Sequence, residues 1–154
     1  MLAEPRVDTA YTNDSQCPPS KVPVVIILTT KQVANGLVAV AHRALVEGDF
    51  ATAALAHNEL FVRQALQDPK AADNDRLKTI ESFGRFLALS EEPLKWDPRQ
   101  QQQVPSPALV NAIKVFQDHN ALTPTGVLDY KTLSLAAGLS TTDLLAIVTA
   151  KKPM

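Results

Sequence analysis

Residues 112–133 read AIKVFQDHNALTPTGVLDYKTL, and this stretch decides the fold of the C-terminal half of the chain. The pair Ser106-Pro107 just upstream is typical of a helix start, because a serine hydroxyl caps free backbone N–H groups and proline fits the first turn. Apolar residues then recur at helical spacing at Leu109, Ile113 and Phe116. The sequence therefore predicts a helix, a short loop and a further helix.

Three short motifs in this stretch belong to a known pattern. They are Ile113-Lys114-Val115-Phe116-Gln117 at the end of the first helix, Gly126-Val127 in the loop, and Thr132-Leu133 at the start of the next helix. Together they resemble the three-helix peptidoglycan-binding domain, an accessory module of bacterial cell-wall enzymes, in the version attached to L,D-transpeptidases. A helix expected over Leu77–Leu89 corresponds to the first helix of that family, so the resemblance covers residues 75–138.

The sequence departs from the family pattern at three places. Thr125 precedes the loop glycine where the family has Asp, Asp129-Tyr130 replaces Gly-Pro, and Asn120-Ala121 replaces the glycine that closes the second family helix. Because asparagine tolerates the left-handed conformation, we expect Asn120 to adopt it.

Most of the motif is expected to hold the fold rather than a ligand. Phe116 and Val127 are predicted to be core residues, Gly126 to take a positive φ, and Thr132 to start the last family helix.

A ligand groove, if the module retains one, should lie beside the loop between the last two family helices. The polar residues there offer amide and hydroxyl groups, an aromatic ring and a cation, which suit sugar hydroxyls, N-acetyl groups and peptide carboxylates. These predicted ligand-binding residues are Gln117, His119, Asn120, Thr123, Thr125, Tyr130 and Lys131.

The N-terminal region, residues 1–29, is predicted to be an extended arm with one short strand. The strand is Val22–Leu28, whose β-branched residues favour extended structure and whose Pro23 restricts it to a strand start or an edge. Because no second run of this quality exists in the chain, the strand either pairs with another chain or packs over helices. The predicted partner-binding residues are Val24, Val25, Ile26 and Ile27.

Residues 30–69 predict a helical hairpin, because Gly48 can end one helix and Asp49 can cap the next. The sequence from Ala44 to Phe50, together with the closing pair Asp68-Pro69, is similar to that of a tetratricopeptide unit. The interval from Gly48 to Pro69 is about one helical turn longer than in that family, and only one copy of the unit is present. We therefore expect an isolated helical hairpin rather than a repeat array.

Two polar segments separate the predicted helices. Lys70–Asp75 is expected to be a break, with Asn74 or Asp75 capping the third helix. Ser90–Pro107, rich in glutamine and proline, is expected to be a long mobile loop. A last short helix is predicted over Thr141–Lys151.

Composition excludes several function classes. The chain has 154 residues and a net charge of −1, so it lacks the basic footprint of a nucleic-acid binder. No apolar run reaches the roughly 18 residues that a transmembrane helix needs. Residues Met1–Ala10 lack an apolar signal region, so either export follows another route or a signal was removed.

No catalytic or cofactor constellation is recognisable. A transpeptidase nucleophile would need a histidine close to the cysteine, and Cys17 has none nearby in the sequence. Glu81-Ser82 matches only two residues of a transglycosylase signature. His42 and His57 lie on opposite helices of the hairpin without carboxylates at metal-site spacing. We therefore expect no enzyme activity, no metal and no cofactor.

The sequence as a whole predicts an all-α protein. Its parts are an arm and strand (1–29), a helical hairpin (30–69) and a peptidoglycan-binding-like domain with a C-terminal helix (75–154). The resemblance implies a non-catalytic cell-wall binding protein of the bacterial periplasm or envelope that anchors a larger assembly. The alternative is a structural or adaptor subunit of a secretion or envelope complex or a phage particle, in which the module serves protein contacts.

Overall fold

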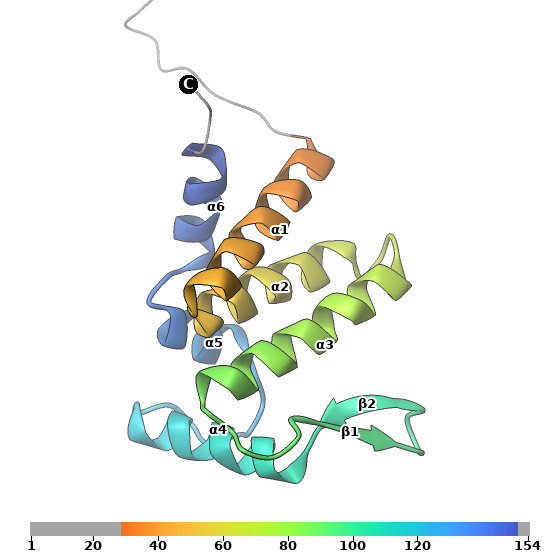
Figure 1. The fold of residues 1–154 in the computed structure, drawn as a ribbon, viewed down its shortest axis with the longest axis vertical. Coiled ribbons are helices and arrows are strands. Elements are labelled where there is room, and N and C mark those ends of the chain that lie inside the picture. The colour runs from red at the N-terminus through yellow and green to blue at the C-terminus, as the bar shows by residue number, and fades with distance from the viewer. Residues whose placement is uncertain (1–28, 151–154) are drawn as a thin grey trace, which may run out of the picture.

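The computed structural model describes residues 29–150, and the predicted N-terminal strand with its partner-binding residues lies outside them, as does Cys17. The described chain is mostly helical, as predicted, with one small two-stranded sheet. Figure 1 shows the order of the elements. They are α1 (Thr30–Glu47), α2 (Phe50–Gln64), α3 (Pro69–Phe86), β1 (Leu94–Asp97), β2 (Gln102–Pro105), α4 (Pro107–His119), α5 (Tyr130–Ala137) and α6 (Thr141–Ala150).

Helices α1 and α2 form the predicted hairpin. Gly48 ends α1 in the left-handed conformation, with φ of 78°, and the Asp49 side chain accepts a hydrogen bond from the Thr52 N–H at 3.2 Å. Thr29 and Gln32 begin α1 as a capping box, in which each side chain accepts a hydrogen bond from the backbone N–H of the other residue. Local sequence signals therefore set both ends of this connection.

Helix α2 is the centre of the fold. Every residue from Ala51 to His57 is buried, and four of these are alanines, whose small side chains let neighbouring helices approach closely. Helices α1, α3 and α5 all pack against it. On the other side of α1 lies α6, and Gly36 of α1 contacts the Val148 side chain so closely that a Cβ there would overlap it.

Helix α3 begins earlier than predicted, which corrects the expected break over residues 70–75. Asp68 caps the helix by accepting from the Ala71 N–H at 3.2 Å, and Pro69 occupies the first turn. The polar residues there lie on a helix face, while Ala72 and Asp75 turn inward and are buried. In the sequence, the polar residues of this first part of α3 are therefore hard to distinguish from those of a loop.

The segment predicted as a long loop contains an antiparallel hairpin, β1 and β2, in which Leu94 pairs with Pro105 and Trp96 with Gln103. Asp97 organises its turn. Its carboxylate accepts hydrogen bonds from the Arg99 N–H at 2.9 Å and the Gln100 side chain at 2.8 Å, and its backbone oxygen accepts from the Gln101 N–H. An Asx turn therefore closes the hairpin despite its glutamine-rich sequence.

A single hydrophobic cluster runs through the described helices. Three phenylalanine rings join α3 to α4: Phe83 lies 5.3 Å from Phe86 and 5.8 Å from Phe116, and the last two rings are 5.7 Å apart. Leu109 and Ile113 of α4, Leu133 of α5 and the residues Leu144 and Val148 of α6 extend the same core. Leu144 and Val148 thus place one face of the predicted last helix in the core, whereas the predicted division of the chain at residues 69–75 stays a prediction.

Candidate functional site

The loop between α4 and α5, residues 120–129, carries three of the seven predicted ligand-binding residues, and the other four lie at the adjoining ends of α4 and α5. Helix α4 leads into it from a regular start, because the Ser106 hydroxyl accepts from the Leu109 N–H at 3.2 Å. In Figure 1 this loop leaves the end of α4 that is opposite to the β hairpin.

The loop begins with a tight reversal of the backbone. The Asn120 side chain donates to the Phe116 carbonyl oxygen at 2.7 Å, and the Leu122 N–H donates to the Gln117 carbonyl oxygen at 2.8 Å. The left-handed residue is Ala121, with φ of 59°, while Asn120 has φ of −111°. The prediction for Asn120 was wrong. Its side chain caps the C-terminus of α4, and the chain reverses at the next residue.

Gln117 organises the interior of the loop. Its side chain is buried and its Nε2 donates to the Val127 carbonyl oxygen at 3.0 Å and to the Thr132 hydroxyl at 2.9 Å. Its Oε1 accepts from the Gly126 N–H at 2.9 Å. One glutamine therefore holds three backbone or side-chain groups that come from the loop and from α5.

Gly126 adopts the predicted positive φ, 78°, and also lies close to α4. A Cβ at this position would sit 2.8 Å from Val110 Cγ1 and 3.1 Å from Lys114 Cε. The next residue corrects a prediction: Val127 is 60% exposed, and Leu128 packs on the core instead. The buried glycine directs the chain so that the two side chains after it point to opposite sides.

Helix α5 starts at Tyr130 after an aspartate cap, two residues before the predicted start at Thr132. The Asp129 carboxylate accepts from the Thr132 N–H at 2.9 Å and from the Thr132 hydroxyl at 2.6 Å. The hydrogen bond from the Thr132 side chain, with the backbone N–H of the same residue, holds the pKa of Asp129 below its usual value. Asp129 therefore carries a negative charge at the rim of the loop at neutral pH.

A cavity of about 240 Å³ opens between the loop and the first turn of α5. Hydroxyl groups, one carboxylate and one ammonium group line it together with two apolar side chains. Its lining residues are Ala121, Leu122, Thr123, Thr125, Asp129, Lys131 and Thr132.

The structure brings three of the seven predicted residues to this cavity: Thr123, Thr125 and Lys131. Gln117 lies beneath the loop, where its amide is fully engaged. The other three predicted residues, His119, Asn120 and Tyr130, are exposed but do not line the cavity.

Tyr130 has a structural contact that the sequence did not indicate. Its hydroxyl oxygen accepts a hydrogen bond from the Thr141 N–H at 2.8 Å, which links α5 to the start of α6, and this bond lowers the pKa of the phenol. Conversely, Asp129 was not among the predicted ligand residues. Its place three residues before Thr132, at a helix start, is the signal that could have identified it.

The cavity has the chemistry of a polar ligand site. Threonine hydroxyls both donate and accept hydrogen bonds, Asp129 accepts them from ligand hydroxyls or amides, and Lys131 attracts a carboxylate. Within residues 29–150, no three histidine, cysteine, aspartate or glutamate side chains gather as a metal site would require.

The described helices were also compared with the requirements for crossing a membrane. No single helix in residues 29–150 is long and apolar enough, and only α5 and α6 together, bent by 59° between them, meet the length and composition test.

Residues 94–135 match the sequence model of the family described as "Putative peptidoglycan binding domain". The matched range begins at β1 and includes α4, the loop with its cavity and most of α5. No curated protein and no solved structure shows significant similarity to the chain. The resemblance seen in the sequence motifs is therefore confirmed, and a peptidoglycan-binding domain is present.

Proposed function

We propose that the protein is a non-catalytic cell-wall binding protein whose contact with peptidoglycan is made by the cavity between α4 and α5. The observation that carries the proposal is that this cavity lies wholly within the residues that match the family. Its hydroxyls, carboxylate and single ammonium group complement the sugar hydroxyls, amides and carboxylates of the wall polymer.

Lys131 and Thr123 are the residues that we assign to direct ligand contact. Lys131 is an exposed cation at the cavity, and Thr123 is an exposed hydroxyl in the loop. Thr125 has a mixed role, because its hydroxyl also accepts from the Val127 N–H at 3.1 Å and stabilises the loop. Among the exposed predicted residues, His119, Asn120 and Tyr130 form the outer margin of the proposed contact.

The remainder of the chain is proposed to anchor a larger assembly in the bacterial envelope, in the periplasm or, as the alternative, in a phage particle. Peptidoglycan-binding modules need a second element to act as tethers. The segment assigned to protein partners is the one with Val24, Val25, Ile26 and Ile27, which precedes α1. In the alternative function, as a structural subunit, this contact with another chain is the main task.

A sedimentation assay with purified insoluble peptidoglycan tests the wall contact. The intact protein should co-sediment, and the double variant Lys131→Gln with Thr123→Val should bind about tenfold more weakly, because it loses a charge-assisted and a neutral hydrogen bond.

The matched control is Lys31→Gln, which removes the same charge from an exposed position in the first turn of α1, outside the matched range. This variant should co-sediment like the intact protein. Equal binding by the double variant would contradict the assignment of the cavity, and no binding by the intact protein would favour the alternative as a structural subunit.

A further inference from the structure

A second cavity lies outside the matched domain, between α1, α2 and α3, and has a volume of about 310 Å³. That volume is at the lower end of the range for small-molecule sites. Helix α1 contributes the apolar side chains of Val38, Ala41 and Leu45 and, beside them, the imidazole of His42. The opposite wall, from α3, is polar and charged.

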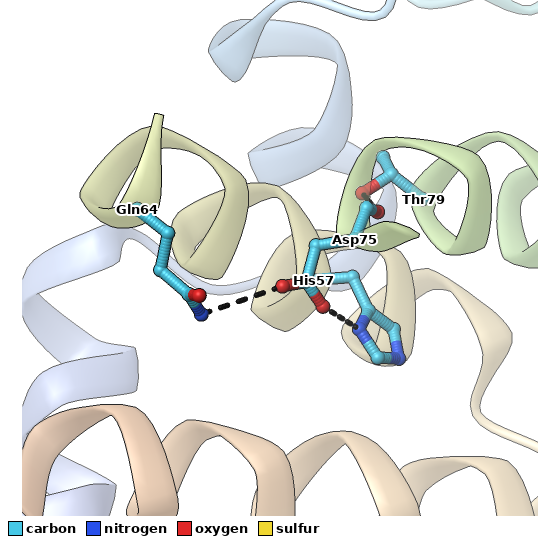
Figure 2. A network of polar contacts seen from close by, with 4 residues as sticks. All are labelled: His57, Gln64, Asp75 and Thr79. Atoms are coloured by element: carbon cyan, nitrogen blue, oxygen red, sulfur yellow. Dashed lines mark hydrogen bonds and ion pairs between the residues drawn. The ribbon is translucent and has the colours of Figure 1, made fainter. Parts of the chain in front are cut away.

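The most informative residue in this cavity is His57 of α2. Its side chain is only 7% exposed, and its Nδ1 lies 3.1 Å from the Asp75 Oδ1 (Figure 2). Because an ionised carboxylate only accepts hydrogen bonds, the ring proton is assigned to Nδ1, and this N–H donates a hydrogen bond to Asp75. Thr79 and Gln64 flank Asp75, with the Thr79 hydroxyl donating to the Asp75 backbone oxygen at 2.9 Å.

The other ring nitrogen of His57 has no hydrogen-bond partner within residues 29–150 and borders the cavity. Figure 2 shows this nitrogen on the side of the ring away from Asp75. Burial lowers the pKa of His57, and the charge of Lys78 lowers it further, against the opposing effect of Asp75. The ring is neutral at pH 7, so Nε2 is an acceptor that calls for an N–H or O–H donor.

Two cations and one anion of α3 line the same cavity as His57. Lys78, Glu81 and Arg85 share one face of α3, and within residues 29–150 none of them forms an ion pair. Arg85 is held in place by Phe50, because its guanidinium carbon lies 4.6 Å from the ring centroid. The net charge of these three side chains is +1, which complements a monoanion such as a carboxylate better than a doubly charged phosphate.

We propose that this cavity binds the free carboxyl terminus of a short peptide with small apolar side chains. The peptide carboxylate would lie at Lys78 and Arg85, its last amide N–H would donate to His57 Nε2, and its side chains would pack against Val38, Ala41 and Leu45. The buried His57, oriented by Asp75, supplies the directional contact, and the exposed cations supply the charge. This site uses none of the residues of the wall-binding cavity.

Titration by NMR of the full chain tests the proposal, with N-acetyl-alanyl-alanine as the probe and its C-terminal amide as the matched control. The acid should shift the imidazole signals of His57 in a saturable way, and the amide should bind at least about tenfold more weakly because it lacks the charge. Equal binding of acid and amide, or no shift at about 10 mM acid, would overturn the proposal.

Two variants on the same helix locate the contact. Lys78→Gln should weaken binding of the acid about tenfold, whereas Lys70→Gln, an exposed position in the first turn of α3, should leave it unchanged. Acetate is the probe for a carboxylate without a peptide. If acetate shifts His57 as strongly as the peptide acid does at equal concentration, the site recognises a carboxylate alone and the peptide assignment is wrong.

Discussion

At the scale of single residues, Gln117 shows how one side chain can replace a stretch of regular structure. The Gly126 N–H of the loop donates to the glutamine Oε1, and the Val127 carbonyl oxygen accepts from the glutamine Nε2 as well as from the Asp129 N–H. An amide has two donor hydrogens and an acceptor oxygen, which a leucine or a glutamate of similar size cannot reproduce. The residue is therefore more important to loop geometry than to a ligand.

Replacement of Gln117 by leucine tests this role. The variant keeps most of the volume but leaves the buried Gly126 N–H without a hydrogen-bond partner, which costs about 1–3 kcal/mol. We expect the free energy of unfolding, measured with urea, to fall by at least that amount. Gln67→Leu, at an exposed position just beyond α2, should change it by less than about 0.5 kcal/mol. Equal stability of the two variants would show that the buried network is unimportant.

At the scale of secondary-structure elements, the sequence predicted what local signals determine. The Gly48 and Asp49 connection and the Ser106-Pro107 helix start all appeared as expected, because each depends on residues within one turn of it. The same holds for the Gly126 turn. The loop cavity was predicted in part, since its residues are close together in the sequence.

Features that depend on tertiary contacts were not predicted. The start of α3 was missed because Asp75 looks like a cap in the sequence, whereas it is buried against His57, eighteen residues away. The hairpin β1–β2 was missed because its pairing rests on the Asp97 turn rather than on alternating apolar residues. Val127 was wrongly predicted to be a core residue for a similar reason, because the direction of the chain after Gly126 is fixed by contacts with α4.

Two glycines with the same backbone conformation separate local strain from packing. Gly48 and Gly126 both have φ of 78°, but a Cβ at Gly48 would meet nothing within 4 Å, whereas one at Gly126 would meet Val110 and Lys114. Gly48→Ala should therefore cost only the left-handed strain, about 1–2 kcal/mol. Gly126→Ala should cost about 1–3 kcal/mol more, since Val110 must move. Urea unfolding of both variants measures the difference, and equal losses would mean that α4 yields to the added methyl group.

At the scale of the whole molecule, the helices share one core and α2 is at its centre. His57 is buried in α2 and its partner Asp75 is buried in α3, so the pair joins two helices that pack against each other. A buried histidine that stays neutral makes stability depend on pH, because the unfolded chain can take up a proton that the folded protein resists. We therefore expect this pH dependence in the global unfolding transition rather than in the opening of a local loop.

The direction of this pH dependence follows from the lowered pKa of His57. Burial depresses the pKa in the folded protein below the ordinary histidine value of about 6.5, so the stabilisation is complete above about pH 6.5 and is lost as the pH falls towards the folded-state pKa. In that window the free energy of unfolding should fall by up to about 1.4 kcal/mol per pH unit. His57→Gln should flatten this slope, whereas His119→Gln, at an exposed position, should preserve it.

Urea unfolding at intervals between about pH 7.5 and pH 5 measures the slope for the three proteins. NMR titration of the His57 ring in the unmodified chain gives an independent check that does not require the variant to fold, and its midpoint should lie below the ordinary histidine value of about 6.5. A slope that persists unchanged in His57→Gln would assign the acid sensitivity to other groups. A midpoint of His57 at or above about pH 6.5 would show that its hydrogen bond with Asp75 outweighs the desolvation by burial.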